Sequence, residues 1–222
     1  MPVISSPIMY WPLMLLGAYV LGSIPFAQVM ARLRGVDLRQ VGSGNVGAGN
    51  LTRTVGVGWG VTAAVLDGLK GLVPVWLALR YGLGPGAAGL VGVAAVIGHN
   101  WSIFMRGRSG RGLAPAAGLL LALNPAMIVW TTGWSLAGWK IGGGLAGFLG
   151  WGLLPIVSVA LGNPVTESIL ILLLSAVLIG RRMQGNVGDY IDTASMMRRA
   201  VYDTDRVEGS TGGEAADDPL TP

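Results

Sequence analysis

A glycine-rich segment in the first quarter of the chain has the residue types of an anion-binding loop. Residues 39–53 read RQVGSGNVGAGNLTR, and four of the eight residues from 42 to 49 are glycine. Glycine allows the backbone to aim several N–H groups into one concavity. Guanidinium groups at the two ends are suited to forked contacts with phosphate oxygens. The segment therefore predicts a phosphate cradle made of Arg39, Gly42, Ser43, Gly44, Asn45, Gly47, Asn50 and Arg53.

Two more familiar phosphate motifs do not fit this segment. The spacing of Gly42, Gly44 and Gly47 matches a dinucleotide fingerprint, but no strand–helix–strand unit surrounds it. A Walker loop requires a lysine after Gly47, where Ala48 stands. A flexible connector is the simpler alternative, although a linker has no need of paired asparagines and flanking arginines. The cradle is the favoured hypothesis.

A second segment, residues 104–112, has a similar composition. It reads FMRGRSGRG, so glycines again alternate with guanidinium groups. Arg111 lies between Gly110 and Gly112 at the start of the next apolar run, where a helix N-terminus would add unpaired amides. Arg106 and Arg108 are explained by the charge rule for membrane insertion. Arg111, with its two glycines, is therefore the candidate ligand of this segment.

Three ionisable residues lie within or at the end of apolar runs. Asp67 and Lys70 are three residues apart, so they share one helix face. Charges inside a membrane pair or line a polar cavity, and we expect an ion pair that faces the bundle interior. Direct contact between Lys70 and a substrate stays open. His99 is the only histidine, and it is either a proton carrier or the residue that pins the loop by a hydrogen bond.

The composition indicates which elements position these residues. The chain has 222 residues, of which 52% are apolar and only 12% charged, whereas soluble domains carry about 25% charged residues. The basic residues behind the net charge of +4 fall between apolar runs, which favours orientation in a bilayer over nucleic-acid binding. Cysteine is absent, so disulfides and thiolate chemistry are excluded. A lone histidine without cysteine predicts no metal site, and we expect no cofactor.

Apolar runs long enough to cross a bilayer recur along the chain. We expect spans at residues 10–30, 57–79, 86–104, 141–161 and 165–179. The run 113–139 is too long for one ordinary span, and Asn124-Pro125 in its middle disfavours helix, so it is divided there into two short helices. The sequence therefore predicts an all-α, polytopic membrane helix bundle with about seven transmembrane helices.

The positive charges predict the orientation of these spans. With the N-terminus outside, thirteen basic residues fall in cytoplasmic segments and only Arg80 falls outside. Positive residues are retained on the cytoplasmic side during insertion, so the C-terminus is expected to be cytoplasmic and the protein to be multi-pass in the cell membrane. Residues 1–202 are expected to form a single transmembrane domain. Residues 203–222 are polar and are expected to be a disordered tail.

Several separate blocks resemble the bacterial acyl-phosphate glycerol-3-phosphate acyltransferases of the PlsY family. The blocks are residues 22–26 (GSIPF), 41–47 (VGSGNVG), 66–71 (LDGLKG), 98–99 (GH) and 110–112 (GRG), together with Asn50 and Arg53. The resemblance covers roughly residues 21–118 well, and the rest mainly by the number of spans. Blocks in the family's order and spacing are far more specific than any single glycine loop.

The resemblance implies transfer of a fatty acyl group from acyl phosphate to glycerol 3-phosphate, which gives lysophosphatidate and inorganic phosphate. It implies an active site at the cytoplasmic membrane face, with both substrates and membrane lipid as the partners and no obligate protein partner. Ser43, Asn45, Asn50 and Arg53 would hold or orient substrate, and Arg111 would replace the family's lysine. The leaving phosphate would assist deprotonation of the attacking hydroxyl.

The chain departs from the family pattern at three places. Gly49 stands where the family has threonine, and Ser109 and Arg111 stand where it has glycine and lysine. The family's third motif, after the last span, contains a histidine and an asparagine near an arginine. The corresponding residues 181–186 read RRMQGN, which has no histidine. Two alternatives therefore stay open. One is a divergent, non-catalytic homologue that binds a phosphorylated lipid or metabolite. The other is a small transporter, which usually shows two related halves that are not evident here.

Overall fold

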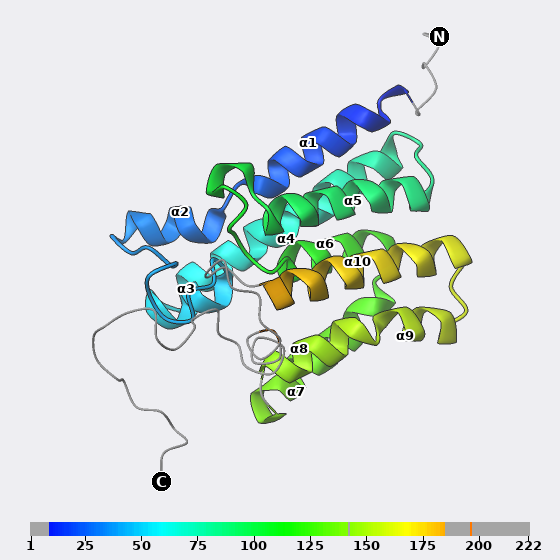
Figure 1. Ribbon diagram of the computed structural model, residues 1–222. Helices are drawn as coiled ribbons and strands as arrows, with labels where there is room; N and C mark the ends of the chain where they lie inside the picture. The colour runs from blue at the N-terminus through cyan, green and yellow to red at the C-terminus, as the bar shows by residue number, and fades with distance from the viewer. Residues whose placement is uncertain (1–8, 142, 185–195, 197–222) are drawn as a thin grey trace.

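The computed structural model describes residues 9–141, 143–184 and 196, and every regular element among them is helical (Figure 1). The elements are α1 (Trp11–Ser23), α2 (Phe26–Leu33), α3 (Ala48–Thr54), α4 (Val57–Arg80), α5 (Pro85–Asn100), the 3₁₀ turn η2 (Ile103–Met105), α6 (Leu113–Leu123), α7 (Ala126–Ile141), α8 (Gly143–Gly152), α9 (Leu154–Ala160) and α10 (Val165–Gln184). The long helices lie side by side, and α2 and α3 stand at one end of the bundle. The expected tail, residues 203–222, lies outside the described residues.

Membrane character is evident in the length and composition of the helices. Three helical segments are long and apolar enough to cross a bilayer, namely Trp11–Leu33, Val57–Arg80 and Pro85–Met105. The helices α6 and α7 are separated at Asn124-Pro125, as predicted from the proline. Helix α6 has only 11 residues, or about 16 Å at the usual rise, which is short for a full crossing.

Two expected spans are each broken into two helices. The first was expected to be continuous over residues 10–30, but α1 ends at Ser23 and α2 begins at Phe26. Pro25 lies in the break, because proline cannot donate the hydrogen bond that would continue the helix. The sixth was expected over residues 141–161, but α8 and α9 are separated at Leu153, and Pro155 stands in the first turn of α9. In both cases a proline stands at the break.

Glycine allows the central helices to pack backbone against backbone. A Cβ placed on Gly71 of α4 would lie 1.8 Å from the carbonyl oxygen of Pro115 in α6, and one on Gly118 of α6 would lie 1.9 Å from the carbonyl oxygen of Gly68. Helices α1 and α5 meet in the same way, with Gly22 against Ala95. Close approach through small residues is the usual means of holding membrane helices together, because lipid supplies no hydrophobic drive.

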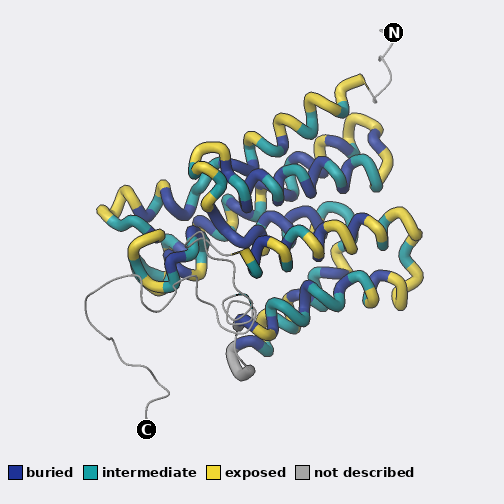
Figure 2. The backbone as a smooth tube through the Cα atoms, viewed as in Figure 1, coloured by how far each residue is buried: buried dark blue, intermediate teal, exposed yellow. Residues whose placement is uncertain are grey.

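Burial is greatest where α4, α5 and α6 meet, whereas α1 and the connecting turns are largely exposed (Figure 2). The exposed residues include the apolar Leu13, Leu16 and Tyr81. The main core cluster joins residues of α4, α5, α6 and α10, including Val75, Val96, Leu119 and Leu174. A second, smaller cluster lies beside α2 and α3 and contains Leu38, Val46 and Leu51. Loop residues belong to this second cluster, so it gives the glycine-rich segment a packed base.

The close contact of α4 with α6 predicts the effect of one added methyl group. Gly71→Ala should lower the free energy of unfolding by about 1–3 kcal/mol, because the methyl group meets backbone that cannot move aside. The measurement is the midpoint of thermal unfolding in detergent. Gly17→Ala is the matched control, since Gly17 in α1 is exposed and has no atom within 4 Å of the added Cβ. Equal midpoints for the two variants would contradict the packing.

Candidate active site

The side chain of Asn50 organises the first glycine-rich segment, which is called loop 1 here (residues 34–47, leading into α3). Its amide nitrogen donates to the carbonyl oxygens of Leu38, Val41 and Asn45 at 3.0–3.1 Å. Its amide oxygen accepts the backbone N–H of Ser43 at 3.1 Å. Asn50 is only 1% exposed. We therefore infer that Asn50 shapes the loop from within, and its expected role in holding or orienting substrate stays a prediction.

The turns of loop 1 require glycine at the positions expected from the sequence. Gly42 and Gly44 have φ angles of 56° and 74°, in the left-handed region that other residues rarely adopt. A Cβ on Gly42 would also lie 2.1 Å from the Asn50 amide oxygen. Gly47 is extended and stands at the N-cap of α3. The glycines thus let the chain wrap closely around Asn50.

The polar side chains beside Asn50 differ in how far they are exposed. Arg53, on α3, lies on the exposed side of the loop and donates to the Ser43 hydroxyl at 3.5 Å. The side-chain oxygen of Asn45 is buried and has no hydrogen-bond partner among the described residues. Ser43 and Arg53 therefore lie together on the loop, and Asn45 has a buried amide oxygen with hydrogen-bonding capacity left.

Arg39, expected to flank the cradle, has a different partner. Its guanidinium forms a two-pronged ion pair with Asp37, at 3.0 Å from Nε and 2.7 Å from Nη2. The Arg39 guanidinium holds the pKa of the Asp37 carboxyl well below its usual range, and hydrogen bonds from the Arg39 N–H and the Gln28 amide lower that pKa further. Asp37 in turn raises the pKa of Arg39. Arg39 therefore closes the start of loop 1 and leaves Arg53 as the guanidinium beside Ser43.

The second segment, called loop 2 here (residues 101–112), passes against the buried His99. A Cβ on Gly110 would lie 2.0 Å from the His99 Nε2, so only glycine fits there. Gly112 has a φ of 76° and forms the N-cap of α6. Arg111, between them, is 7% exposed. His99 therefore contacts loop 2 through packing against Gly110.

Two residues that hold or border loop 2 were not identified as such from the sequence. Arg181 of α10 donates to the carbonyl oxygens of Ser109 and Gly110 at 2.9 and 3.1 Å, although these residues are 72 and 71 positions away. From the sequence, the positive charge of Arg181 is explained by the rule that basic residues stay on the cytoplasmic side of the membrane. Asn100 is fully buried beside Gly112, and neither polar atom of its amide has a hydrogen-bond partner among the described residues. Its position directly after His99 was the only signal.

Asp67 and Lys70 form the expected ion pair in the interior. The Lys70 ammonium lies 2.6 Å from the Asp67 carboxylate, and the two side chains are 1% and 2% exposed. Lys70 also donates to the carbonyl oxygen of Ile24 and lies 4.8 Å from the ring centroid of Phe26. The His99 Nδ1 is 3.7 Å from the same carboxylate. These partners favour the structural role of Lys70 over direct contact with substrate.

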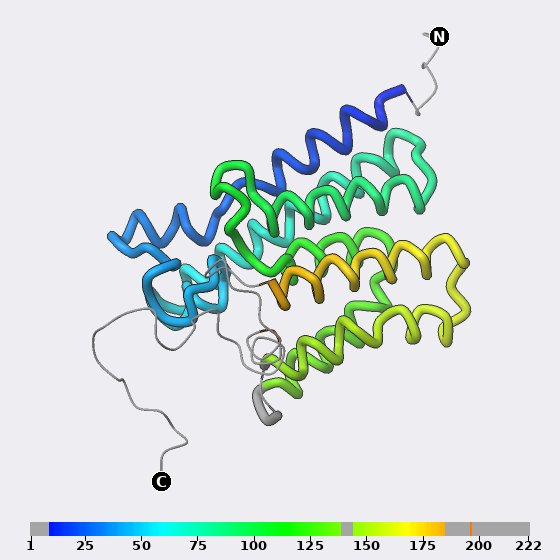
Figure 3. Tube along the Cα trace, viewed as in Figure 1, coloured from blue at the N-terminus to red at the C-terminus, as the bar shows by residue number. Residues whose placement is uncertain are grey.

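Both glycine-rich segments lie at one end of the bundle (Figure 3). Met105 of loop 2 packs against the cluster that contains Val46 of loop 1 and Leu51 of α3. Helix α4 begins just after α3, and it runs beside α6, which begins just after loop 2. The same end of the bundle therefore carries Ser43 and Arg53 from the first segment and Arg111 from the second.

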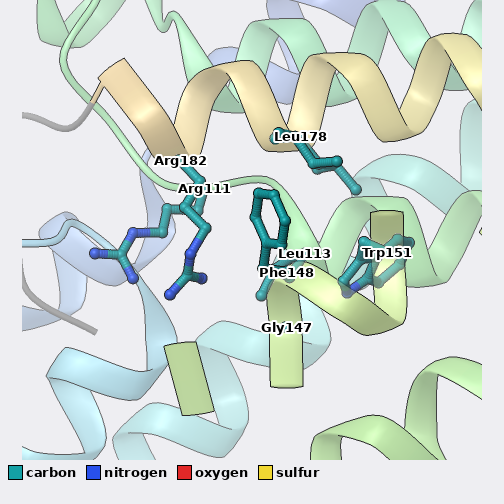
Figure 4. A pocket seen from close by; sticks show the side chains of 8 residues that line it. Arg111, Leu113, Gly147, Phe148, Trp151, Leu178 and Arg182 are labelled. Carbon is teal, nitrogen blue, oxygen red and sulfur yellow. The ribbon is translucent and has the colours of Figure 1, made fainter. Parts of the chain in front are cut away.

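An apolar wall borders Arg111. The side chains of Arg111 and Arg182 extend in the same direction, with the ring of Phe148 beside them (Figure 4). The pocket between them is also lined by Leu113, Trp151 and Leu178. Cationic groups next to an apolar wall match a ligand that has a phosphate at one end and a hydrocarbon chain at the other.

Comparison with known proteins agrees with this chemistry. The sequence profile described as glycerol-3-phosphate acyltransferase matches residues 12–193. The chain belongs to the glycerol-3-phosphate acyltransferase family. A member from Thermus thermophilus is 39% identical over 178 residues, which cover 76% of this chain and 84% of the relative. One from Deinococcus radiodurans is 39% identical over 177 residues, or 75% and 85% of the two chains.

The fold is similar to that of solved members of the family. A crystal structure of PlsY, described as an integral membrane glycerol 3-phosphate acyltransferase in its glycerol 3-phosphate form, matches with a TM-score of 0.73 at 34% identity. The match covers 78% of this chain and 88% of PlsY. The lysophosphatidic acid form matches with a TM-score of 0.71. The predicted PlsY resemblance, the all-helical membrane fold and the acyltransferase class are thereby confirmed.

The bonds of Asn50 predict that this residue is needed for the shape of loop 1. Asn50→Ala removes both the donor and the acceptor that join its backbone, so loop 1 should open. The measurement is the rate of limited trypsin cleavage after Arg39 and Arg53, which should rise about tenfold or more, since loss of a buried hydrogen-bond network favours local opening. Asn163→Ala, at the other end of the bundle, is the control. Unchanged cleavage in Asn50→Ala would contradict the role of this side chain.

Proposed function

We propose that the protein transfers a fatty acyl group from acyl phosphate to glycerol 3-phosphate. The observation that carries this proposal is the placement of two glycine turns at one end of the bundle, with Ser43 and Arg53 on one and Arg111 on the other. Both substrates carry a phosphate group, and the donor also carries a hydrocarbon chain. Phe148 and Trp151 place apolar surface beside Arg111, in a pocket of about 10 Å³ that is too small to hold the chain itself.

The reaction forms one ester bond and breaks one anhydride bond. The hydroxyl oxygen of glycerol 3-phosphate attacks the carbonyl carbon of the acyl phosphate, and the bond from that carbon to the phosphate oxygen breaks. The hydroxyl proton passes to the leaving phosphate, which departs as inorganic phosphate. Holding and orienting two anionic reactants, together with stabilisation of the developing negative charge, accounts for the acceleration.

The roles of the residues follow from their positions. Arg53 and the Ser43 hydroxyl hold one phosphate, with the Asn45 amide beside them. Arg111 holds the other phosphate at the start of α6, where the first N–H groups of the helix add hydrogen-bond donors. Gly42, Gly44, Gly47, Gly110 and Gly112 allow the two turns to approach the reactants. Asp67, Lys70, His99 and Asn50 support these turns from within.

We further infer that the chain crosses the cell membrane seven times. The crossing segments are α1 with α2, then α4, α5, α6, α7, α8 with α9, and α10. Helix α6 is included because the turns at its two ends lie at opposite ends of the bundle, although its 11 residues are few for a crossing. The positive charges favour an external N-terminus and a cytoplasmic C-terminus. Thirteen basic residues lie in loop 1, α3, loop 2 and the other segments that are expected to be cytoplasmic. The active site then faces the cytoplasm, where soluble glycerol 3-phosphate reaches a donor held in the membrane.

The proposed reaction predicts the behaviour of the protein reconstituted in lipid vesicles. Phosphate should be released from palmitoyl phosphate only when glycerol 3-phosphate is present, and lysophosphatidate should form in equal amount. Arg53→Ala should lower kcat/KM for glycerol 3-phosphate about 10- to 100-fold, the loss typical of a hydrogen bond to a charged group. Arg34→Ala is the matched control. Arg34, at the end of α2, is exposed, and its guanidinium stacks on the ring of Trp59 in α4.

The outcomes separate the acyltransferase from its alternatives. Binding of glycerol 3-phosphate without phosphate release would support the non-catalytic homologue. Flux of glycerol 3-phosphate across sealed vesicles without acyl transfer would support a transporter. Release of phosphate at the same rate without glycerol 3-phosphate would indicate simple hydrolysis and would overturn the proposed acceptor.

The orientation can be tested with single cysteines, because the natural chain has none. Arg108→Cys in loop 2 should react with a membrane-impermeant maleimide only after intact cells are opened. Tyr81→Cys, in the exposed turn between α4 and α5, should react in intact cells. The reverse pattern would show that the spans run in the opposite direction.

A further inference from the structure

At the break in the first span, two backbone carbonyl groups accept hydrogen bonds from side chains of other segments. A helix end leaves its last carbonyl groups without partners inside the helix. The Ser102 hydroxyl in loop 2 donates to the carbonyl oxygen of Ser23 at 2.5 Å. The Lys70 ammonium in α4 donates to the carbonyl oxygen of Ile24. Ser23, Lys70 and Ser102 are at most 1% exposed, so these contacts lie within the protein.

The break is also the point from which loop 1 is oriented. Helix α2 begins directly after it, and the Gln28 side chain of α2 donates to Asp37 at 2.9 Å and accepts the N–H of Leu38 at 3.2 Å. Leu38 packs with Ala27 and Ala31 of α2 and with Leu51 of α3. The direction in which α2 leaves the break therefore determines where loop 1 and its Ser43 lie.

The same two contacts reach loop 2. Ser102 belongs to loop 2, and its carbonyl oxygen accepts the N–H of Gly107 at 2.9 Å. Lys70 is paired with Asp67, whose carboxylate lies 3.7 Å from His99, and His99 packs against Gly110. A continuous set of contacts thus joins Arg111's glycine turn to the start of α2.

We propose that Ser102 and Lys70 are positioning residues that fix loop 1 and loop 2 relative to each other through the carbonyl groups of Ser23 and Ile24. This inference rests on the proposed function, in which each loop holds one of the two reactants. A loosened contact leaves the phosphate-binding groups of each loop intact and changes the distance between the bound reactants. Transfer should therefore suffer more than binding.

The first variant is Ser102→Ala. Its kcat should fall about tenfold, because displacement of the reactants by about 1 Å costs up to a hundredfold, while both KM values stay within about threefold. Ser158→Ala is the matched control. Ser158 in α9 is also fully buried, and its hydroxyl is hydrogen-bonded to Ser168 at 2.9 Å, but it is far along the chain from both loops. It should lose stability to a similar degree and keep kcat per folded protein.

The second variant is the double substitution Asp67→Asn with Lys70→Met. Replacement of both members of a buried ion pair by neutral groups of similar size is tolerated in other proteins, so the variant should fold. The Ile24 carbonyl loses the donor from α4 and keeps only the local N–H of Phe26. The kcat should again fall about tenfold with little change in KM. A kcat equal to that of the natural protein in this variant and in Ser102→Ala would overturn the proposal, as would an equal loss in Ser158→Ala.

A measurement independent of activity tests the same contact. Spin labels on Gly49→Cys in α3 and Arg108→Cys in loop 2, both exposed positions, report the distance between the loops. The distance distribution should broaden or shift in Ser102→Ala and in the double variant, and should stay unchanged in Ser158→Ala. Identical distributions would overturn the positioning role. If the natural protein transfers no acyl group but the variants still show these distance shifts, only the proposed function is contradicted, and the positioning role is kept.

Discussion

The buried ion pair between Lys70 and Asp67 is the interaction on which the rest of the site depends. Two charges inside an apolar bundle are stable only when they are paired and when their remaining hydrogen-bonding capacity is also met. The carbonyl of Ile24 meets that requirement for Lys70, and it is available because Pro25 breaks the first span. A charge in one helix and a break in another therefore stabilise each other. Helix α2 leads from this break into loop 1, and His99 links the ion pair to Gly110 of loop 2.

Much of this arrangement could be predicted from local features of the sequence. The start of α4 at Val57 and the division at Asn124-Pro125 follow from hydrophobic length and proline, which act over a few residues. The pairing of Asp67 with Lys70 follows from helical spacing. The breaks at Pro25 and Leu153 were missed, because hydrophobicity continues through them, although a proline stands at or near each.

The partners of polar side chains were harder to predict. Ser43, Asn45 and Asn50 are neutral polar residues of similar character, and only the folded chain shows that Asn50 is the one whose amide bonds the backbone of loop 1. Arg39 and Arg53 are alike in the sequence, yet Asp37 engages Arg39 two residues away. Arg181 reaches Ser109 and Gly110 across more than 70 residues. Such contacts depend on how helices pack, which the spacing of residues does not encode.

Arg181 also bears on the departure from the family in the third motif. The resemblance places a histidine in this region, but the described part of it has arginine at 181 and 182. Guanidinium stays charged at all physiological pH values, so it cannot exchange a proton as histidine does. It can hold carbonyl groups firmly, and Arg181 does so at loop 2. A reaction in which the leaving phosphate accepts the proton requires fixed cations and rigid turns more than a protein base, and the arginines at this end of α10 are suited to that requirement.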